Sequence, residues 1–290
     1  MSAIRQPGKL NEHTTLIDIR EWGFPGITAV YLVEGERACL IDGGTREEAP
    51  QIVSALRECN AFPPGMIIVT HPHYDHTQGI PYLRAEAARE GKSIQVMASQ
   101  QAVALLHDQS FNEVYGPGPY ENVADVTPLA EGDVVDLGGV GLRIYDVPGH
   151  CQGHIAILDE GLGNLFVGDA LGNKLGDNEF IPAFMSPFWD WDAFYSSVDK
   201  LKHVSYGSLC LAHFGYIYGS EAQSILEEAA SVSERWWQLL ERNVGRLEDT
   251  DYMVQAIARE VGLDPQMLRA IVGWLVMGYR AYRESRAADA

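Results

Sequence analysis

Hydrophobic positions in the first part of the chain fall into short runs that polar turns separate. Residues 27–33 and 38–42 are two such runs, and Glu34-Gly35-Glu36 lies between them. Two apolar runs joined by a short turn that contains glycine are typical of a β-hairpin. The pattern then changes period, because the apolar positions of residues 47–59 recur on one face of a helix.

The middle of the chain alternates between strand-like and helix-like segments. Short apolar runs predict strands, whereas residues 81–90, rich in Ala, Glu and Arg, and residues 101–107 predict helices. The predicted strands cover residues 66–69, 94–98, 134–137, 142–147, 154–158 and 165–169. Strands that alternate with helices indicate a mixed α/β domain.

From residue 220 the pattern becomes helical. Ser220 is the predicted N-cap of a helix that runs to about Asn243 and is ended by Gly245. A second helix is expected over residues 249–261 with Gly262 as its stop, and a third from Pro265 to about residue 285. We therefore predict a main catalytic domain over residues 1–219 and a three-helix appendage over residues 220–290.

The third predicted helix has a rather apolar face that includes Trp274, Met277, Tyr279 and Tyr282. Packing against the main domain accounts for most of these side chains. The appendage would equally suit a cover over a functional site, or the contact surface of a homodimer.

The densest chemical signal follows the apolar run 66–69. His71, His73, Asp75 and His76 lie within six residues, and each is a metal-ligand type. Three further ligand types each follow a predicted strand, namely His150, Asp169 and His213. Five histidines and two aspartates suffice for two metal ions and a bridging carboxylate. Such a set predicts metal-activated water, and hence hydrolysis.

The spacing within the motif assigns its four residues to two different metal ions. His71 and His73 are two residues apart where a strand runs out, so they can point the same way and hold one ion. Asp75 and His76 follow the turn and can face a second ion. Imidazole and carboxylate ligands suit Zn²⁺, and they also suit Fe or Mn. We expect two divalent ions per chain, with Zn²⁺ favoured.

On these motifs the chain resembles the metallo-β-lactamase superfamily over about residues 14–220. The resemblance implies an αββα sandwich, here with the C-terminal helical appendage. It also implies that His71, His73 and His150 hold the first metal, that Asp75, His76 and His213 hold the second, and that Asp169 bridges the two. Asp42, at the end of a predicted strand, is either a turn residue or a residue that orients a histidine.

The seven-ligand set favours one branch of this superfamily. True β-lactamases do not use a bridging aspartate at this position, whereas glyoxalase II and the acyl-homoserine-lactone lactonases keep all seven ligand types. The glutathione-binding basic residues of glyoxalase II are not evident, and the tyrosine that often follows the aspartate in lactonases is absent after Asp169. Persulfide dioxygenases, which use one iron, fit the same ligand inventory.

Composition narrows the classes of partner. The formal net charge is −19, so nucleic acid is a poor partner, because phosphate binding needs a basic surface. The sequence contains no apolar run of 18 residues and no apolar signal core near Met1, so we expect a cytoplasmic protein without a membrane partner. Cys39 and Cys210 are expected in strands as buried apolar residues, and Cys151 follows His150 without a vacant ligand position.

Two inserts, residues 107–127 and 172–194, interrupt the periodic pattern. They are rich in Gly and Pro, and the second carries Phe180, Phe184, Phe188, Trp189, Trp191 and Phe194. Aromatic loops after strand ends suit a lid over an apolar or acyl-bearing small-molecule substrate. Packing of the aromatic side chains against the C-terminal helices is an equal alternative.

The leading hypothesis is a dinuclear metal-dependent hydrolase acting on a thioester, a lactone or another carboxylic ester. Two ions that share a water lower its pKa and supply metal-bound hydroxide at neutral pH. Asp169 would bridge the ions, and Asp75 would also relay a proton. Two alternatives stay open: a mononuclear non-haem iron dioxygenase acting on a persulfide, and a ligand-sensing or protein-binding module on the same fold.

Overall fold

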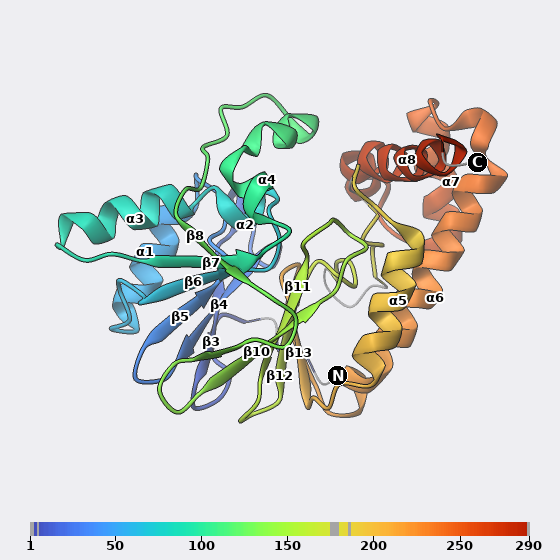
Figure 1. Ribbon diagram of the computed structural model, residues 1–290. Coiled ribbons are helices and arrows are strands. Elements are labelled where there is room, and N and C mark those ends of the chain that lie inside the picture. Colours follow the sequence, from blue (N-terminus) through green and yellow to red (C-terminus); the bar gives the residue numbers. More distant parts are fainter. Residues whose placement is uncertain (1–2, 5, 175–179, 185–186, 289–290) are drawn as a thin grey trace.

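Two seven-stranded sheets form the centre of the protein. The computed structural model describes residues 3–4, 6–174, 180–184 and 187–288. The two sheets pack against each other, and helices cover the outer side of each (Figure 1). The order helix, sheet, sheet, helix is the predicted αββα sandwich, and this prediction is confirmed.

The first sheet contains the predicted hairpin and the strand before the histidine motif. Its order is β2-β3-β4-β5-β6-β7-β8, antiparallel up to β5 and parallel from β5 to β8. The parallel strands therefore end at one common edge. The bounds are β2 (Gly8–Lys9), β3 (Thr14–Asp18), β4 (Ala29–Glu34), β5 (Ala38–Ile41), β6 (Met66–Val69), β7 (Gln95–Ser99) and β8 (Val126–Leu129).

The second sheet has the order β1-β14-β13-β12-β11-β10-β9. Its strands pair antiparallel except β12 and β13, which run parallel and end at the same edge. The bounds are β1 (Ala3–Ile4), β9 (Val134–Asp136), β10 (Gly141–Asp146), β11 (Ile155–Asp159), β12 (Asn164–Gly168), β13 (Ser208–Leu211) and β14 (Gly215–Tyr218).

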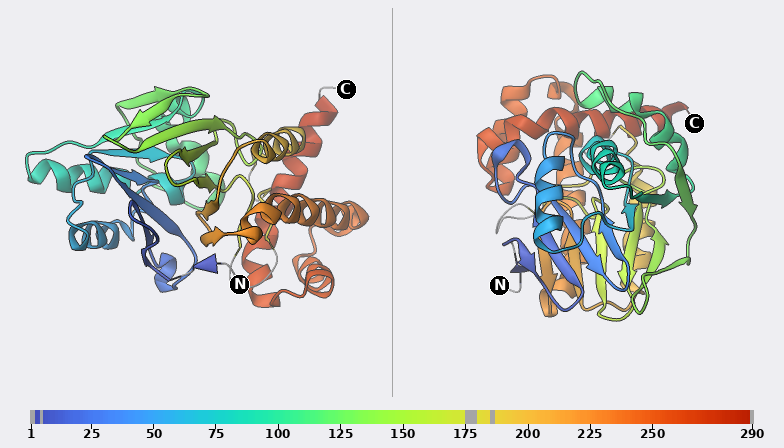
Figure 2. Two further views of the ribbon diagram at one scale, coloured as in Figure 1. Left: turned by 90° about the horizontal axis from the view of Figure 1, so that it is seen from below. Right: turned by 90° about the vertical axis from the view of Figure 1, so that its left-hand side faces the viewer.

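The longer helices form the two outer layers. Helices α1 (Ala49–Glu58) and α3 (Ile80–Arg89) cover the first sheet, and α5 (Trp191–Lys202) and α6 (Ser220–Arg242) cover the second (Figure 1). Helices α7 (Thr250–Val261) and α8 (Pro265–Ala288) lie with α6 beyond the second sheet (Figure 2). Short helical segments fill the connections: η1 (Glu21–Gly23), α2 (Tyr74–Thr77), α4 (Val103–His107), η2 (Gln109–Tyr115) and η3 (Val244–Arg246).

Three hydrophobic clusters correspond to the three interfaces between these layers. One joins the first sheet to α1 and α3, and a second lies between the two sheets. The third joins the second sheet to α5 and the C-terminal helices. In α1 the buried residues are Ala49, Ile52, Val53 and Leu56, which is the apolar face that the sequence predicts.

The C-terminal segment forms the three predicted helices, but two predicted boundary residues are wrong. Ser220 is the first helical residue and Gly219 caps the helix without a side-chain hydrogen bond. Helix α6 ends at Arg242, and Gly245 lies in the following turn η3. Gly262 does end α7, with a left-handed φ of 71°. The division into residues 1–219 and 220–290 stays a prediction.

Most aromatic residues of the second insert pack into the core. Phe180, Phe184, Trp189 and Phe194 are buried, and Phe184 and Trp191 contact Trp237 of α6 with ring centroids 6.0 and 4.6 Å away. Packing against the C-terminal helices is therefore the role of these side chains. Residues 175–179 and 185–186 of this insert lie outside the described residues.

Within the described residues, none of the helices is both long enough and apolar enough to pass through a lipid bilayer.

Candidate metal centre

The seven predicted ligands lie at the ends of strands, at one edge of the two packed sheets. His71 and His73 follow β6, and the short helix α2 carries Asp75 and His76. On the second sheet, His150 follows β10, and Asp169 and His213 directly follow the parallel pair β12 and β13. The segments that follow strand ends of both sheets thus carry all seven side chains. These side chains form two groups, each of which could hold a metal ion.

The first group is formed by His71, His73 and His150. His73 Nδ1 lies 3.0 Å from His71 Nε2 and 2.8 Å from His150 Nε2. All three residues are buried. Three imidazole nitrogens that converge on one point are a ligand set typical of zinc.

The second group is formed by Asp75, His76, Asp169 and His213. Asp75 Oδ2 lies 3.1 Å from His213 Nε2 and 3.4 Å from His76 Nε2. The group combines imidazole nitrogens with carboxylate oxygens, which suits a divalent transition metal.

Asp169 lies between the two groups. Its Oδ2 is 3.7 Å from His150 Nε2 of the first group and 3.6 Å from His213 Nε2 of the second. Its Oδ1 is 3.6 Å from His76 Nε2, and both of these atoms are buried without a hydrogen-bond partner in the described residues. Buried polar atoms without partners are costly, so their convergence fits bound cations.

The nitrogens that face away from the centre have hydrogen-bond partners. His150 Nδ1 lies 2.6 Å from the Ala183 carbonyl oxygen, and His213 Nδ1 lies 3.0 Å from the Ile27 carbonyl oxygen. Because a carbonyl only accepts, each Nδ1 carries a proton and donates, which makes Nε2 the nitrogen available to a metal ion at the centre. The backbone thereby selects the tautomer that a metal ligand needs.

Asp42 orients a histidine, which is one of the two roles that the sequence left open. Its Oδ2 accepts a hydrogen bond from His76 Nδ1 at 2.9 Å, and its Oδ1 accepts one from the Thr70 backbone N–H at 2.7 Å. Asp42 adopts a φ of 64°, a left-handed conformation that aspartate tolerates better than most residues. The carboxylate therefore fixes both the loop after β6 and the His76 ring.

A glycine makes room for the aspartate between the groups. Gly168 has a φ of 49°, and a Cβ atom there would lie 2.7 Å from Thr70 Oγ1 and 2.9 Å from the His154 ring. A side chain at this position would push apart the two strand ends that carry Asp169 and His71.

Burial and charge set the protonation of the histidines. Burial lowers the pKa of His71, His73 and His150, so these rings are neutral at pH 7, as metal ligands must be. At His213 burial also lowers the pKa, but Asp169 and Asp75 outweigh it and raise the pKa to about 9. A bound cation would have to displace that proton.

Three residues that sequence reasoning missed support the centre. His154 stacks on His71 with ring centroids 4.6 Å apart, and its Nε2 accepts the Asp169 backbone N–H at 3.1 Å. The Thr28 hydroxyl lies 2.9 Å from His213 Nδ1 and donates to the carboxylate of Glu21. Burial and the nearby Asp75 raise the pKa of Glu21 to about 7.

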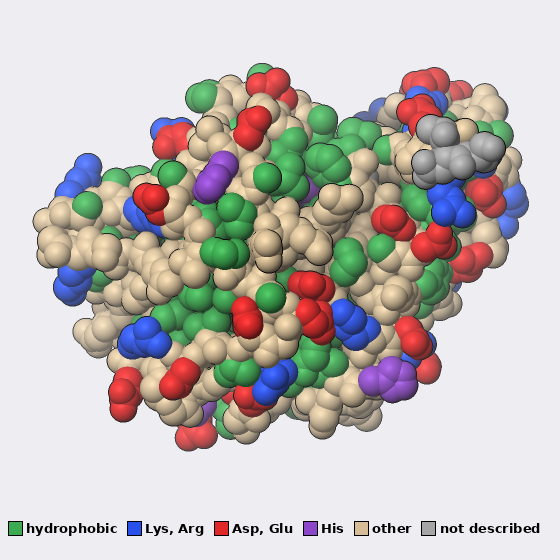
Figure 3. Space-filling model, in the orientation of Figure 1, with side chains coloured by type: hydrophobic (Ala, Val, Ile, Leu, Met, Phe, Trp, Pro, Cys, Tyr) green, Lys and Arg blue, Asp and Glu red, His purple; other side chains and the backbone are tan. Residues whose placement is uncertain are grey.

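A cavity of about 210 Å³ opens onto the centre. Its walls come from the segment around η1, from the short helix α2, from Tyr115 of η2 and from helix α8. Tyr115 and Trp274 meet across it with ring centroids 6.1 Å apart. Hydrophobic side chains gather on the surface between the segment that contains α4 and the C-terminal helices (Figure 3). The C-terminal helices therefore form one wall of the site.

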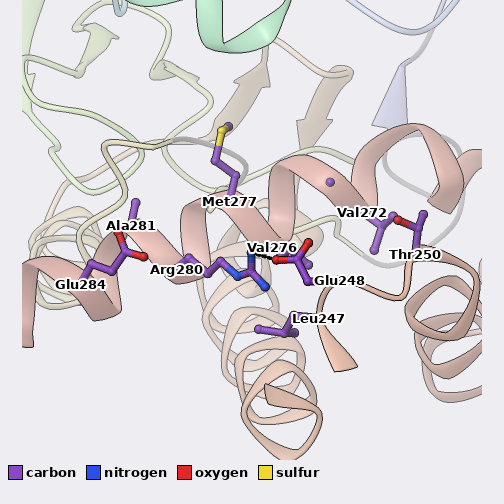
Figure 4. Close-up of a pocket in the computed structure, with 10 residues that line it drawn as sticks. Leu247, Glu248, Thr250, Val272, Val276, Met277, Arg280, Ala281 and Glu284 are labelled. Carbon is purple, nitrogen blue, oxygen red and sulfur yellow. Dashed lines mark hydrogen bonds and ion pairs between the residues drawn. The ribbon is translucent and has the colours of Figure 1, made fainter. Parts of the chain in front are cut away.

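A second hollow lies along a different side of α8. Figure 4 shows Val272, Val276 and Arg280 of α8 in its lining, with Arg280 paired to Glu248. None of the seven ligand-type residues lines this hollow, so the chemistry belongs to the cavity at the strand ends.

Comparison with known proteins gives a family match. A family model described as the metallo-beta-lactamase superfamily matches residues 23–213. A metallo-beta-lactamase family protein of Thermus thermophilus has a similar structure, with a TM-score of 0.63, 20% identity and coverage of 99% of this chain and 94% of that one. At that identity the likeness shows the fold alone.

Two curated relatives match part of the chain. A hydroxyacylglutathione hydrolase of Xanthomonas campestris is 32% identical over 135 residues, 47% of this chain and 42% of that protein. An acyl-coenzyme A thioesterase of Gallus gallus is 30% identical over 116 residues, 37% of this chain and 42% of that protein. The chain thus aligns with less than half the length of each.

Proposed function

Because the chain belongs to the metallo-beta-lactamase superfamily, we propose that it is a dinuclear metal-dependent hydrolase of an ester-type bond: a thioester, a lactone or another carboxylic ester. The observation that carries the proposal is the position of Asp169, whose two carboxylate oxygens face ligand nitrogens of both groups. A carboxylate placed between two ligand groups suits a bridge between two cations.

Each group has a distinct set of residues for an ion. His71, His73 and His150 would hold the first ion, and Asp75, His76 and His213 would hold the second. Two divalent ions there would supply Lewis acidity, polarising a carbonyl oxygen and lowering the pKa of a water. Zn²⁺ suits these ligands best, and Fe or Mn also fits.

The protein's own residues would orient the reaction. Asp75 lines the cavity and would move a proton between water and leaving group. Tyr74 and Tyr115 also line the cavity and restrict water around the substrate. The thioester hydrolases among the relatives support a carboxylic acid derivative as the substrate.

Substitution at the bridge tests the proposal. We expect Asp169→Ala to lose bound metal and hydrolysis of thioester, lactone and ester substrates, because both ions lose a ligand. Cys151→Ala is the matched control, since Cys151 is buried beside His150 but belongs to neither group. Unchanged metal content and turnover in Asp169→Ala would refute the proposal.

A further inference from the structure

The described residues that line the cavity beside the metal centre form an apolar wall and include no lysine or arginine. Helix α8 contributes Met267, Ala270, Ile271 and Trp274, which recur with helical spacing and form one face. Leu268, Val272 and Leu275 are buried in the core instead. Met267 and Ile271 are half-buried and also pack against this core, so the apolar face both holds the helix and lines the cavity.

Trp22 and Ile27 add further apolar side chains to the lining. At about 210 Å³ the cavity is smaller than the ~300–1,000 Å³ of sites that enclose drug-sized ligands. It suits a short group rather than a long carrier.

No lysine or arginine is among the described residues that line this cavity. Residues 175–179 and 185–186, which lie outside the described part, contain neither residue in the sequence. Arg20, Lys174 and Arg269 each adjoin a lining residue along the chain, but none of the three lines the cavity. The Lys174 ammonium is buried and paired with Glu228 at 2.6 Å, Arg269 is paired with Asp251 at 2.5 Å, and Arg20 is exposed. An anionic group placed against the apolar wall of α8 would be desolvated without a lysine or arginine partner among the described lining residues.

We propose that the cavity selects substrates in which the group bound beside the metal centre, on either side of the scissile bond, is short, uncharged and apolar. Ile271 and Trp274 of α8 would be the specificity-determining residues. This inference rests on the proposed ester hydrolysis. Anionic carriers such as glutathione or coenzyme A would need lysine or arginine partners, which are not among the described residues that line the cavity, although relatives that act on such thioesters match part of the chain. Favourable burial would instead come from alkyl groups against α8.

Matched thioesters test the proposal on the metal-loaded, full-length protein. We would compare S-butanoyl-N-acetylcysteamine, which is uncharged, with S-butanoylglutathione and butanoyl-coenzyme A, and include S-hexadecanoyl-N-acetylcysteamine for length. We expect kcat/KM to be at least about tenfold higher for the uncharged butanoyl thioester than for each of the other three. Equal or faster hydrolysis of the anionic thioesters would overturn the inference and leave the proposed hydrolase intact.

Hydrolysis of none of these thioesters, nor of a lactone or phenyl ester, would instead refute the proposed function, and the inference with it. The two failures are therefore distinguishable, because the first leaves turnover present and the second removes it.

Variants of α8 locate the selectivity. Ile271→Arg supplies the missing cation, so we expect the ratio of kcat/KM between anionic and uncharged butanoyl thioesters to rise about tenfold or more. Trp274→Ala should raise KM for the uncharged substrate. Met277→Ala is the control, because Met277 lines the separate hollow on α8. A folding defect lowers all rates together, so an unchanged ratio in Ile271→Arg would overturn the assignment.

Discussion

Asp42→Asn isolates the role of the carboxylate behind His76. Asparagine tolerates the left-handed φ of 64°, and its amide oxygen can keep the 2.7 Å bond from the Thr70 backbone N–H. The Thr70 hydroxyl loses its 2.9 Å contact with Oδ2 but keeps the one at 3.1 Å with Oδ1. The main change is the contact with His76, since an amide NH₂ replaces the oxygen that accepts from Nδ1 at 2.9 Å. An NH₂ group favours the other tautomer, in which Nε2 carries the proton and cannot bind a metal.

The expected loss follows from this single contact. A hydrogen bond to a charged group contributes about 1.5–3 kcal/mol, and loss of a residue that orients a metal ligand weakens metal binding by about 10–100-fold. We expect the second ion to bind Asp42→Asn about 10–100-fold more weakly, with a parallel fall in kcat/KM at limiting metal. The three-histidine group should keep its affinity, because Asp42 bonds none of its members.

Competition with a chromophoric chelator measures both affinities. Asp125→Asn is the matched control, because Asp125 is exposed and also has a positive φ, 52°. If Asp42→Asn bound the second ion as tightly as the unsubstituted protein, the tautomer argument would be refuted.

Three further results are expected. Metal affinity should rise with pH up to about 9, because the pKa of His213 is raised to about 9 and the metal must displace that proton. Each displaced proton changes the affinity by about tenfold per pH unit, and proton release in a metal titration at two pH values measures it. In the metal-free protein the raised pKa stabilises the fold below about pH 6.5 and this contribution is lost as pH rises through about 9, so the Tm should fall across that window. Ile225→Ala, fully buried in α6, should lower the free energy of unfolding by about 2–5 kcal/mol, whereas exposed Ser224→Ala should change it by about 0.5 kcal/mol or less, as chemical denaturation would measure.

The sequence predicted the features that arise from local patterns. The hairpin of β4 and β5, the buried face of α1 and the strands before each ligand have a period that a short window of residues reveals. The seven ligand-type residues lie together because the strand ends that precede them meet at one edge, and their role as metal ligands stays a prediction.

Contacts between distant segments were not predictable in this way. Thr28 meets His213 across 185 positions, and nothing around Glu21 distinguishes it from a surface glutamate. His154 lies within a predicted strand, where alternation alone does not show that its ring stacks on His71.

The aromatic inserts show the same limit in another form. From the sequence, the aromatic side chains of the inserts could equally cover the site or pack in the core. In the structure, some of them do one and some do the other. Phe184 and Trp191 pack on α6, whereas Phe188 and Tyr115 lie beside His73 with ring centroids 6.5 and 5.2 Å away. Which aromatic takes which role depends on the path of α6 and α8, which local composition does not encode.

Metal identity and stoichiometry per chain test the central claim most directly. Elemental mass spectrometry on tag-free protein from unsupplemented cells would give both. The arrangement of two ligand groups around Asp169 predicts two divalent ions per chain, together with hydrolysis of an ester-type bond. One iron per chain with the second group empty, and oxygen uptake with a persulfide in place of hydrolysis, would contradict it.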